Sequence, residues 1–161
     1  MSVWLSNRAS ANRLSLQLAH ERDLKSQEAR RVRVEELYLL ASAWIIAVLT
    51  YSLPYLRVMK GDLSYNQALD ITNSTGAGSG VDFKRLEMLI HIYFSELRGT
   101  FAALLEVRDR TNSILSAHRE NYRQGEINGT QFVAPLLAAQ AAFESVGESF
   151  KSAVIARERE I

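Results

Sequence analysis

Cysteine is absent from the 161 residues, and glycine and proline are scarce, with eight and two copies. Without cysteine the chain has no disulfide scaffold, no thiolate zinc site and no thiol nucleophile. Average usage would give roughly nineteen glycines and prolines together, so turn formers are too few for a many-stranded sandwich or barrel. The chain also lacks a large excess of positive or of negative charge. The 19 Lys and Arg against 18 Asp and Glu leave a net charge of +1, which gives no general attraction to nucleic acid.

The residues that are present favour helices in one domain. At 47% hydrophobic and 23% charged, a chain of this length can bury a core and is not disordered. Neither glycine nor proline occurs from Val3 to Leu53, which predicts one long helix or two nearly continuous ones. The apolar residues of 5–32 hold no helical period. We therefore interpret residues 1–27 as a helical stalk and residues 28–161 as the bundle domain.

The segment Leu37–Leu56 carries no charge over twenty residues, the length that a bilayer crossing needs. Two interpretations stay open: a buried core helix, or a spanning helix of a small integral membrane protein. We favour the core helix, because polar residues such as Ser42 and Ser52 dilute the apolar run and a seam at spacings of three and four passes through it. A second apolar face adds Ile45, Ile46, Leu49 and Leu53. A helix with two apolar faces is either central in its bundle or also packs on another subunit, and from this helix and the projecting stalk we expect a dimer.

Capping signals divide the rest of the chain. Ser64 with Gln67 predicts a capping box for a short helix to about Ile71, residues 73–80 predict a loop, and Asp82 predicts the N-cap of a helix to Gln124. A last helix follows Asn128-Gly129, with its apolar seam ending before a fraying tail at 157–160. The predicted fold is all-α: an elongated antiparallel three-helix bundle in up-down-up order, with a short extra helix and a projecting N-terminal helical stalk. Seven side chains are predicted to be buried: Trp44, Ile45, Leu86, Leu97, Phe101, Phe143 and Phe150.

No pattern in the sequence assigns catalytic, cofactor or metal residues. The spacing of Gly76, Gly78 and Gly80 lacks the preceding strand and following Lys of a phosphate-binding loop, so we interpret it as a connector. The histidines His20 and His91 are isolated from other candidate ligands, and His118 falls on the apolar seam of its helix after Leu115. No serine pairs with a histidine in a strained turn. We expect no enzyme and no cofactor; a bundle enzyme or ligand binder using His91 or His118 is the less favoured alternative.

Four short segments carry a resemblance: 3–8, Val-Trp-Leu-Ser-Asn-Arg; 35–38, Glu-Glu-Leu-Tyr; 58–61, Val-Met-Lys-Gly; and 65–70, Tyr-Asn-Gln-Ala-Leu-Asp. They resemble small bacterial membrane-tethered helical proteins of uncharacterised function. In that group, a single N-terminal transmembrane helix ends in a similar junction and precedes a cytoplasmic helical domain. The resemblance implies a place on the cytoplasmic side of the bacterial inner membrane.

The charge pattern around Trp4 agrees with a membrane junction. Trp4 precedes Arg8 and Arg13, and no acid occurs before Glu21, a pattern typical of the cytoplasmic flank of a span. We expect the codons upstream of Val3 to encode roughly twenty apolar residues. The expected function is a non-enzymatic interaction domain that acts through helix-face self-association or an unknown protein partner, with membrane contact through the segment upstream of Trp4 and no binding of nucleic acid. The alternative is an integral membrane protein with Leu37–Leu56 as the span.

Overall fold

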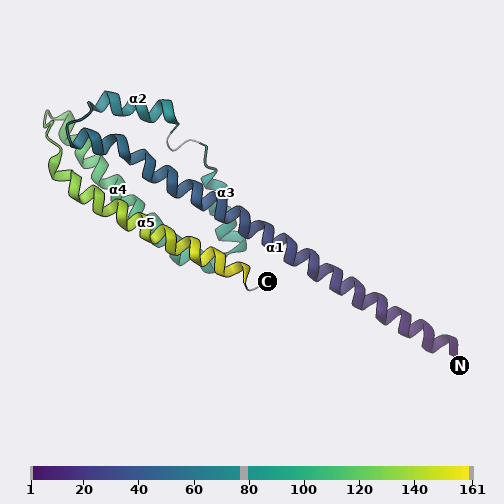
Figure 1. Cartoon of the computed structure of the whole chain (residues 1–161). Helices are drawn as coiled ribbons and strands as arrows, with labels where there is room; N and C mark the ends of the chain where they lie inside the picture. The colour runs from purple at the N-terminus through teal and green to yellow at the C-terminus, as the bar shows by residue number, and fades with distance from the viewer. Residues whose placement is uncertain (1, 77–79, 160–161) are drawn as a thin grey trace.

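The computed structural model describes residues 2–76 and 80–159, with 2–10 described by their backbone alone. It is all-α, as predicted, and the described residues contain no strand. Figure 1 shows the long helices packed together, with the first projecting far beyond the others. The elements in chain order are α1 (Ser2–Met59), α2 (Tyr65–Thr75), α3 (Phe83–Met88), a π-helical turn (Leu89–Tyr93), a 3-10 turn (Ser95–Leu97), α4 (Arg98–Arg123) and α5 (Thr130–Glu158).

Helix α1 is a single helix of 58 residues, which corresponds to a length of about 87 Å. The side chains of residues 11–29 are all exposed, and the first buried side chain after them is that of Val34. The first half of α1 therefore extends past the body (Figure 1). The helix ends where predicted: Gly61, at a φ of 81°, donates its N–H to the Val58 carbonyl at 2.9 Å, a left-handed residue that glycine adopts without strain.

The predicted caps of the two following helices are confirmed. Ser64 and Gln67 form the reciprocal capping box of α2, and an Asp82 carboxylate oxygen accepts the Arg85 N–H at 2.9 Å. Helix α2 continues to Thr75, beyond the predicted end at Ile71, and the Thr75 hydroxyl donates to the Ile71 carbonyl at 2.8 Å. The predicted loop thus begins later, at Gly76. Its Gly78 lies outside the described residues.

The predicted continuous helix from Asp82 to Gln124 is wrong, because the chain leaves the helix at Phe94. The π-helical turn precedes Phe94, whose φ of −130° and ψ of 52° are not helical. The departure places the Phe94 ring in the core, where it is 1% exposed. Arg98 restores part of the lost bonding, since its guanidinium donates to the His91 carbonyl at 2.7 Å. Tyr93 is exposed, and the Arg33 guanidinium lies 4.1 Å from the centroid of its ring.

This break sets the direction of α4. Trp44 of α1 contacts Phe101 of α4. Further along both helices, Tyr51 of α1 and Leu115 of α4 line the same cavity, so residue numbers increase in the same direction on the two helices. Helices α1 and α4 are therefore parallel, and the up-down-up order is corrected on this point. Helix α5 is antiparallel to both. Along α1, Ile45 meets Gly147 and Ser52 meets Gln140; along α4, Phe101 meets Phe150 and His118 meets Phe132.

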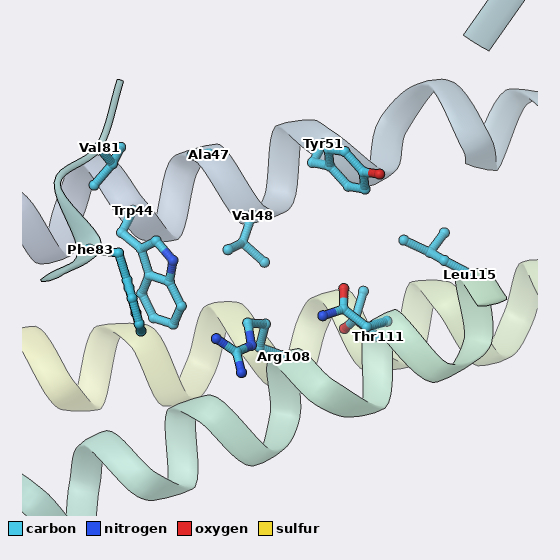
Figure 2. A pocket seen from close by; sticks show the side chains of 10 residues that line it. Trp44, Ala47, Val48, Tyr51, Val81, Phe83, Arg108, Thr111 and Leu115 are labelled. Atoms are coloured by element: carbon cyan, nitrogen blue, oxygen red, sulfur yellow. The ribbon is translucent and has the colours of Figure 1, made fainter. Parts of the chain in front are cut away.

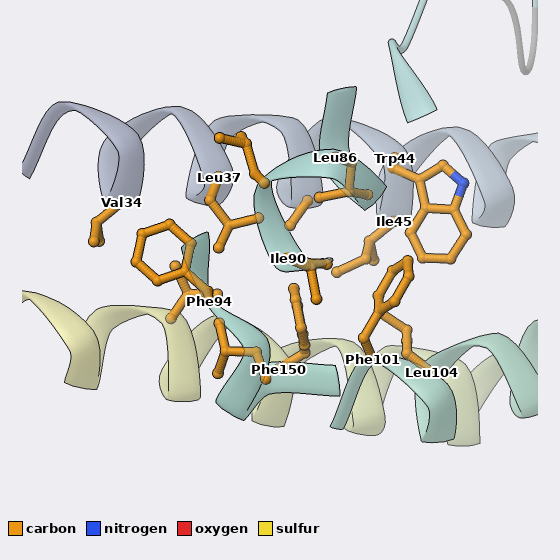
Figure 3. Packing of buried hydrophobic residues seen from close by; sticks show 14 of the residues in the cluster. Val34, Leu37, Trp44, Ile45, Leu86, Ile90, Phe94, Phe101, Leu104 and Phe150 are labelled. Atoms are coloured by element: carbon orange, nitrogen blue, oxygen red, sulfur yellow. The ribbon is translucent and has the colours of Figure 1, made fainter. Parts of the chain in front are cut away.

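The core lies between α1, α3, α4 and α5, as Figure 3 shows. All seven side chains predicted to be buried are at most 7% exposed. Trp44 is central to this cluster: its ring lies 5.2 Å from Phe83 and 5.8 Å from Phe143. The prediction that residues 157–160 fray is wrong for Arg157. This residue is helical and partly buried, and a guanidinium nitrogen lies 3.9 Å from a Glu96 carboxylate oxygen. Glu160 lies outside the described residues.

Phe143→Ala tests the core on α5. Removing a ring that is 1% exposed should lower the free energy of unfolding by about 3–5 kcal/mol, because the packed neighbours cannot fill the space. Chemical denaturation followed by circular dichroism measures the change. Leu137→Ala, at a side chain that is 45% exposed on the same helix, is the matched control and should cost less than about 1 kcal/mol. Equal stabilities of the two variants would contradict this packing.

Candidate functional site

Helix α1 carries a row of exposed apolar side chains on the face that no other helix covers. We call it the outer stripe. Its large members recur every seventh residue and are 53%, 68%, 63% and 51% exposed; they are Val32, Leu39, Ile46 and Leu53. Exposed small residues alternate with them: Ala29, Ala43 and Thr50. Positions at spacings of three and four fall on one side of a helix, so these residues form one continuous strip of surface.

One charged residue, Glu36, falls within the outer stripe. Both of its carboxylate oxygens accept hydrogen bonds from the Arg85 guanidinium of α3, at 2.7 and 2.9 Å. This bidentate pair holds the pKa of Glu36 below its ordinary value, and it ties the carboxylate sideways toward α3. The charge therefore has its partner within the chain and leaves the stripe open for apolar contact.

A groove joins the outer stripe to the end of α5. It has a volume of about 530 Å³ and mostly apolar walls: Val34, Glu35, Tyr38, Leu39, Val154, Ile155 and Glu158. Ile155 is 41% exposed there. Arg31 stands at the rim, 3.1 Å from Glu35 and 3.9 Å from Glu158. The apolar surface of α1 thus widens onto α5 at the end from which the stalk projects.

The uncharged segment Leu37–Leu56 lies in this same part of α1. Helix α1 contains a stretch that is long and apolar enough to cross a membrane, by length and composition only. One side of the segment packs against α5, where Gln140 donates a hydrogen bond to the Ser52 hydroxyl at 2.6 Å. Gly147 of α5 packs on Ile45, and two glutamates near it on α5, Glu144 and Glu148, are exposed. The stretch of α5 that packs on this segment therefore carries charged side chains at its surface.

Among the histidines, His118 is the buried one, and it lies among aromatic rings. Its ring centroid is 5.4 Å from that of Phe132 and 6.2 Å from those of Tyr65 and Tyr122. Neither ring nitrogen has a hydrogen-bond partner, and burial lowers the pKa of His118. Gly129 lies so close that a Cβ there would be 2.7 Å from Nε2. A neutral, wedged imidazole closes this end of the bundle.

The other candidate residues from the sequence are not brought together. His20 lies on the stalk and His91 at the π-helical turn, and both are exposed. Within the described residues, no group of three His, Asp or Glu side chains could hold a metal ion. The side chains of Trp4 and Arg8 lie outside the described part of the chain, and Arg13 is exposed.

No protein-family model, curated protein or solved structure matches this chain. Its surfaces are therefore interpreted from their own residues. Of the second apolar face predicted from the sequence, Ile46 and Leu53 are exposed, whereas Ile45 is buried at 5% exposure. Val32 and Leu39 are not part of that prediction, although their seven-residue interval from Ile46 is a signal present in the sequence.

The buried imidazole predicts a pH dependence of stability. Below its ordinary pKa of about 6.5, His118 takes up a proton in the unfolded chain but not in the folded one, so acid favours unfolding by up to about 1.4 kcal/mol per pH unit. His118→Leu should remove that part of the loss between about pH 7 and 5.5. Chemical denaturation at several pH values measures it. His91→Leu, at an exposed histidine, should keep the parent's slope; a parent slope in His118→Leu would refute the assignment.

Proposed function

We propose that this protein is a non-enzymatic helical interaction module that dimerises through the outer stripe of α1. The observation that carries the proposal is the seven-residue interval of the exposed side chains Val32, Leu39, Ile46 and Leu53. An apolar strip of this kind is expensive to leave in water. Two copies can bury it against each other, because one helix stripe is complementary to itself about a two-fold axis.

The residues between the large side chains support close pairing of two helices. Ala29, Ala43 and Thr50 are small, so two α1 helices can approach while the large side chains fill the spaces beside them. Charges favour a parallel arrangement. Glu28 and Arg33 flank Val32, and in parallel coiled coils residues at these two positions meet across the interface. Glu28 of one copy would then face Arg33 of the second.

Parallel pairing also fits the tether that we propose for the chain. It brings both stalks to the same end of the dimer, as two anchors in one membrane require. Support for a tether comes from the sequence, where Arg8 and Arg13 follow Trp4 without an acid before Glu21. We place the domain on the cytoplasmic side of a bacterial inner membrane. The stripe could receive an unknown protein partner in place of the second copy.

The alternative function, an integral membrane protein with Leu37–Leu56 as the span, is supported by the length and composition of α1. The packing of α5 weighs against it. Glu144 and Glu148 are exposed on the stretch of α5 that packs around Ile45, so a bilayer around the segment would have to take up these carboxylates. Charged groups are costly in hydrocarbon. A helix packed on charged neighbours is better suited to water and a second helix.

Ile46→Glu tests the dimer. Light scattering in detergent-free buffer should give twice the 18.1 kDa chain mass for the parent. The variant should give the monomer mass, because it places two carboxylates opposite each other in the middle of the stripe. Ser113→Glu, at an exposed site on α4, is the control and should remain dimeric.

Two outcomes contradict this proposal. A parent that is monomeric at high micromolar concentration has no self-association through the stripe. A parent that stays in the membrane fraction until detergent is added supports the spanning alternative instead.

A further inference from the structure

A cleft runs between α1 and α4 on a different face of α1 from the outer stripe. It consists of two adjoining cavities of about 200 and 330 Å³, which share Tyr51, Asn112 and Leu115 as walls. Figure 2 shows the first cavity, with Trp44 and Phe83 at one end and Tyr51 and Leu115 toward the other. The cleft exists because α4 runs beside α1 with few direct contacts, while α5 packs closely against both helices.

The first cavity is apolar and has space for one ring. Trp44, Val48 and Phe83 contribute to its walls. An engineered apolar cavity of about 150 Å³ holds benzene, so a volume of about 200 Å³ admits a ring of that size. Arg108 lies beside it, with its guanidinium 5.9 Å from the Trp44 ring and 2.6 Å from an Asp109 carboxylate oxygen. Its charge is already paired, so this end selects apolar groups.

The second cavity is polar and positively charged. Tyr55, Tyr65, Ser116 and Arg119 complete its lining. Burial and the neighbouring Tyr55 phenol raise the pKa of Tyr51 to about 12. Like any phenol at neutral pH, Tyr51 carries its proton and has a hydrogen-bond donor. Arg119 is exposed, and no carboxylate in the described part of the chain lies within ion-pair distance of it.

Acidic residues are missing from the lining of both cavities. In a chain whose net charge is only +1, that composition makes the cleft locally positive. A carboxylate placed here would meet one guanidinium and phenol donors and no repelling charge, and arginine binds carboxylates with two parallel hydrogen bonds.

We propose that the cleft binds an organic monocarboxylate with a ring-sized apolar body. The apolar body lies against Trp44, Val48 and Phe83, and the carboxylate lies at Arg119. Seven residues separate Val48 from Tyr55 on α1, a rise of about 10 Å, so a short flexible chain joins the two parts of the ligand. Binding does not require the dimer, because the outer stripe is on another face of α1.

The test compares phenylbutyrate with phenylbutanol, which differ only in the charged end. Titration is followed by the indole N–H resonance of Trp44. The acid should bind with a Kd on the order of 1 mM, as its size allows, and the alcohol about fivefold more weakly. Arg119→Gln should weaken the acid about fivefold and leave the alcohol unchanged. Arg110→Gln is the matched control, since Arg110 is exposed on α4 outside the cleft lining, and it should change neither.

A second variant tests the ring site. Val48→Phe fills the apolar cavity and should weaken acid and alcohol equally, with circular dichroism reporting its fold. Should that variant not fold, the comparison of Arg119→Gln with Arg110→Gln still decides. The proposal is overturned if neither compound shifts the Trp44 resonance at roughly 10 mM. It is also overturned if acid and alcohol bind equally well, or if the two arginine variants lose the same affinity.

Discussion

The burial of Phe94 is the constraint on which the arrangement of this protein depends. With the ring 1% exposed in the core, the backbone at this residue leaves the helix, and the chain turns before α4 begins. Helix α4 then runs parallel to α1, with α5 antiparallel to both. The cleft between α1 and α4 follows from that direction, since a continuous helix from Asp82 would have carried Arg108 and Arg119 elsewhere. The break is costly in backbone hydrogen bonds, and Arg98 offsets part of the cost at the His91 carbonyl.

Local signals in the sequence predicted the local features correctly. Ser64 and Asp82 cap their helices as expected, and Trp44 and Phe143 are buried, because caps and apolar periodicity depend on a few neighbouring residues. The break at Phe94 could not be predicted in this way. No glycine or proline marks it, and its cause is a set of contacts between segments distant in sequence. The cleft is unpredictable for the same reason, since its walls come from α1, α4 and the segments around Val81 and Tyr65.

Helix α1 presents different chemistry on its different faces. One face packs against α5 in the core, a second lines the cleft through Trp44 and Tyr51, and the third is the outer stripe. The apolar composition of Leu37–Leu56 thus has three separate causes in this fold. Mean hydropathy cannot distinguish them, which explains why the same twenty residues also satisfy the length and composition of a membrane span.

The continuity of α1 has a mechanical consequence. Stalk and body share one helix with no glycine from Val3 to Leu53, so no hinge separates them. A rotation or a force applied at the free end of the stalk is transmitted along the helix to the core. The number of residues in the stalk then sets the orientation of the body about the helix axis, relative to the free end of the stalk. One inserted residue rotates the body by about 100° and moves it by about 1.5 Å, whereas seven inserted residues nearly restore its original orientation.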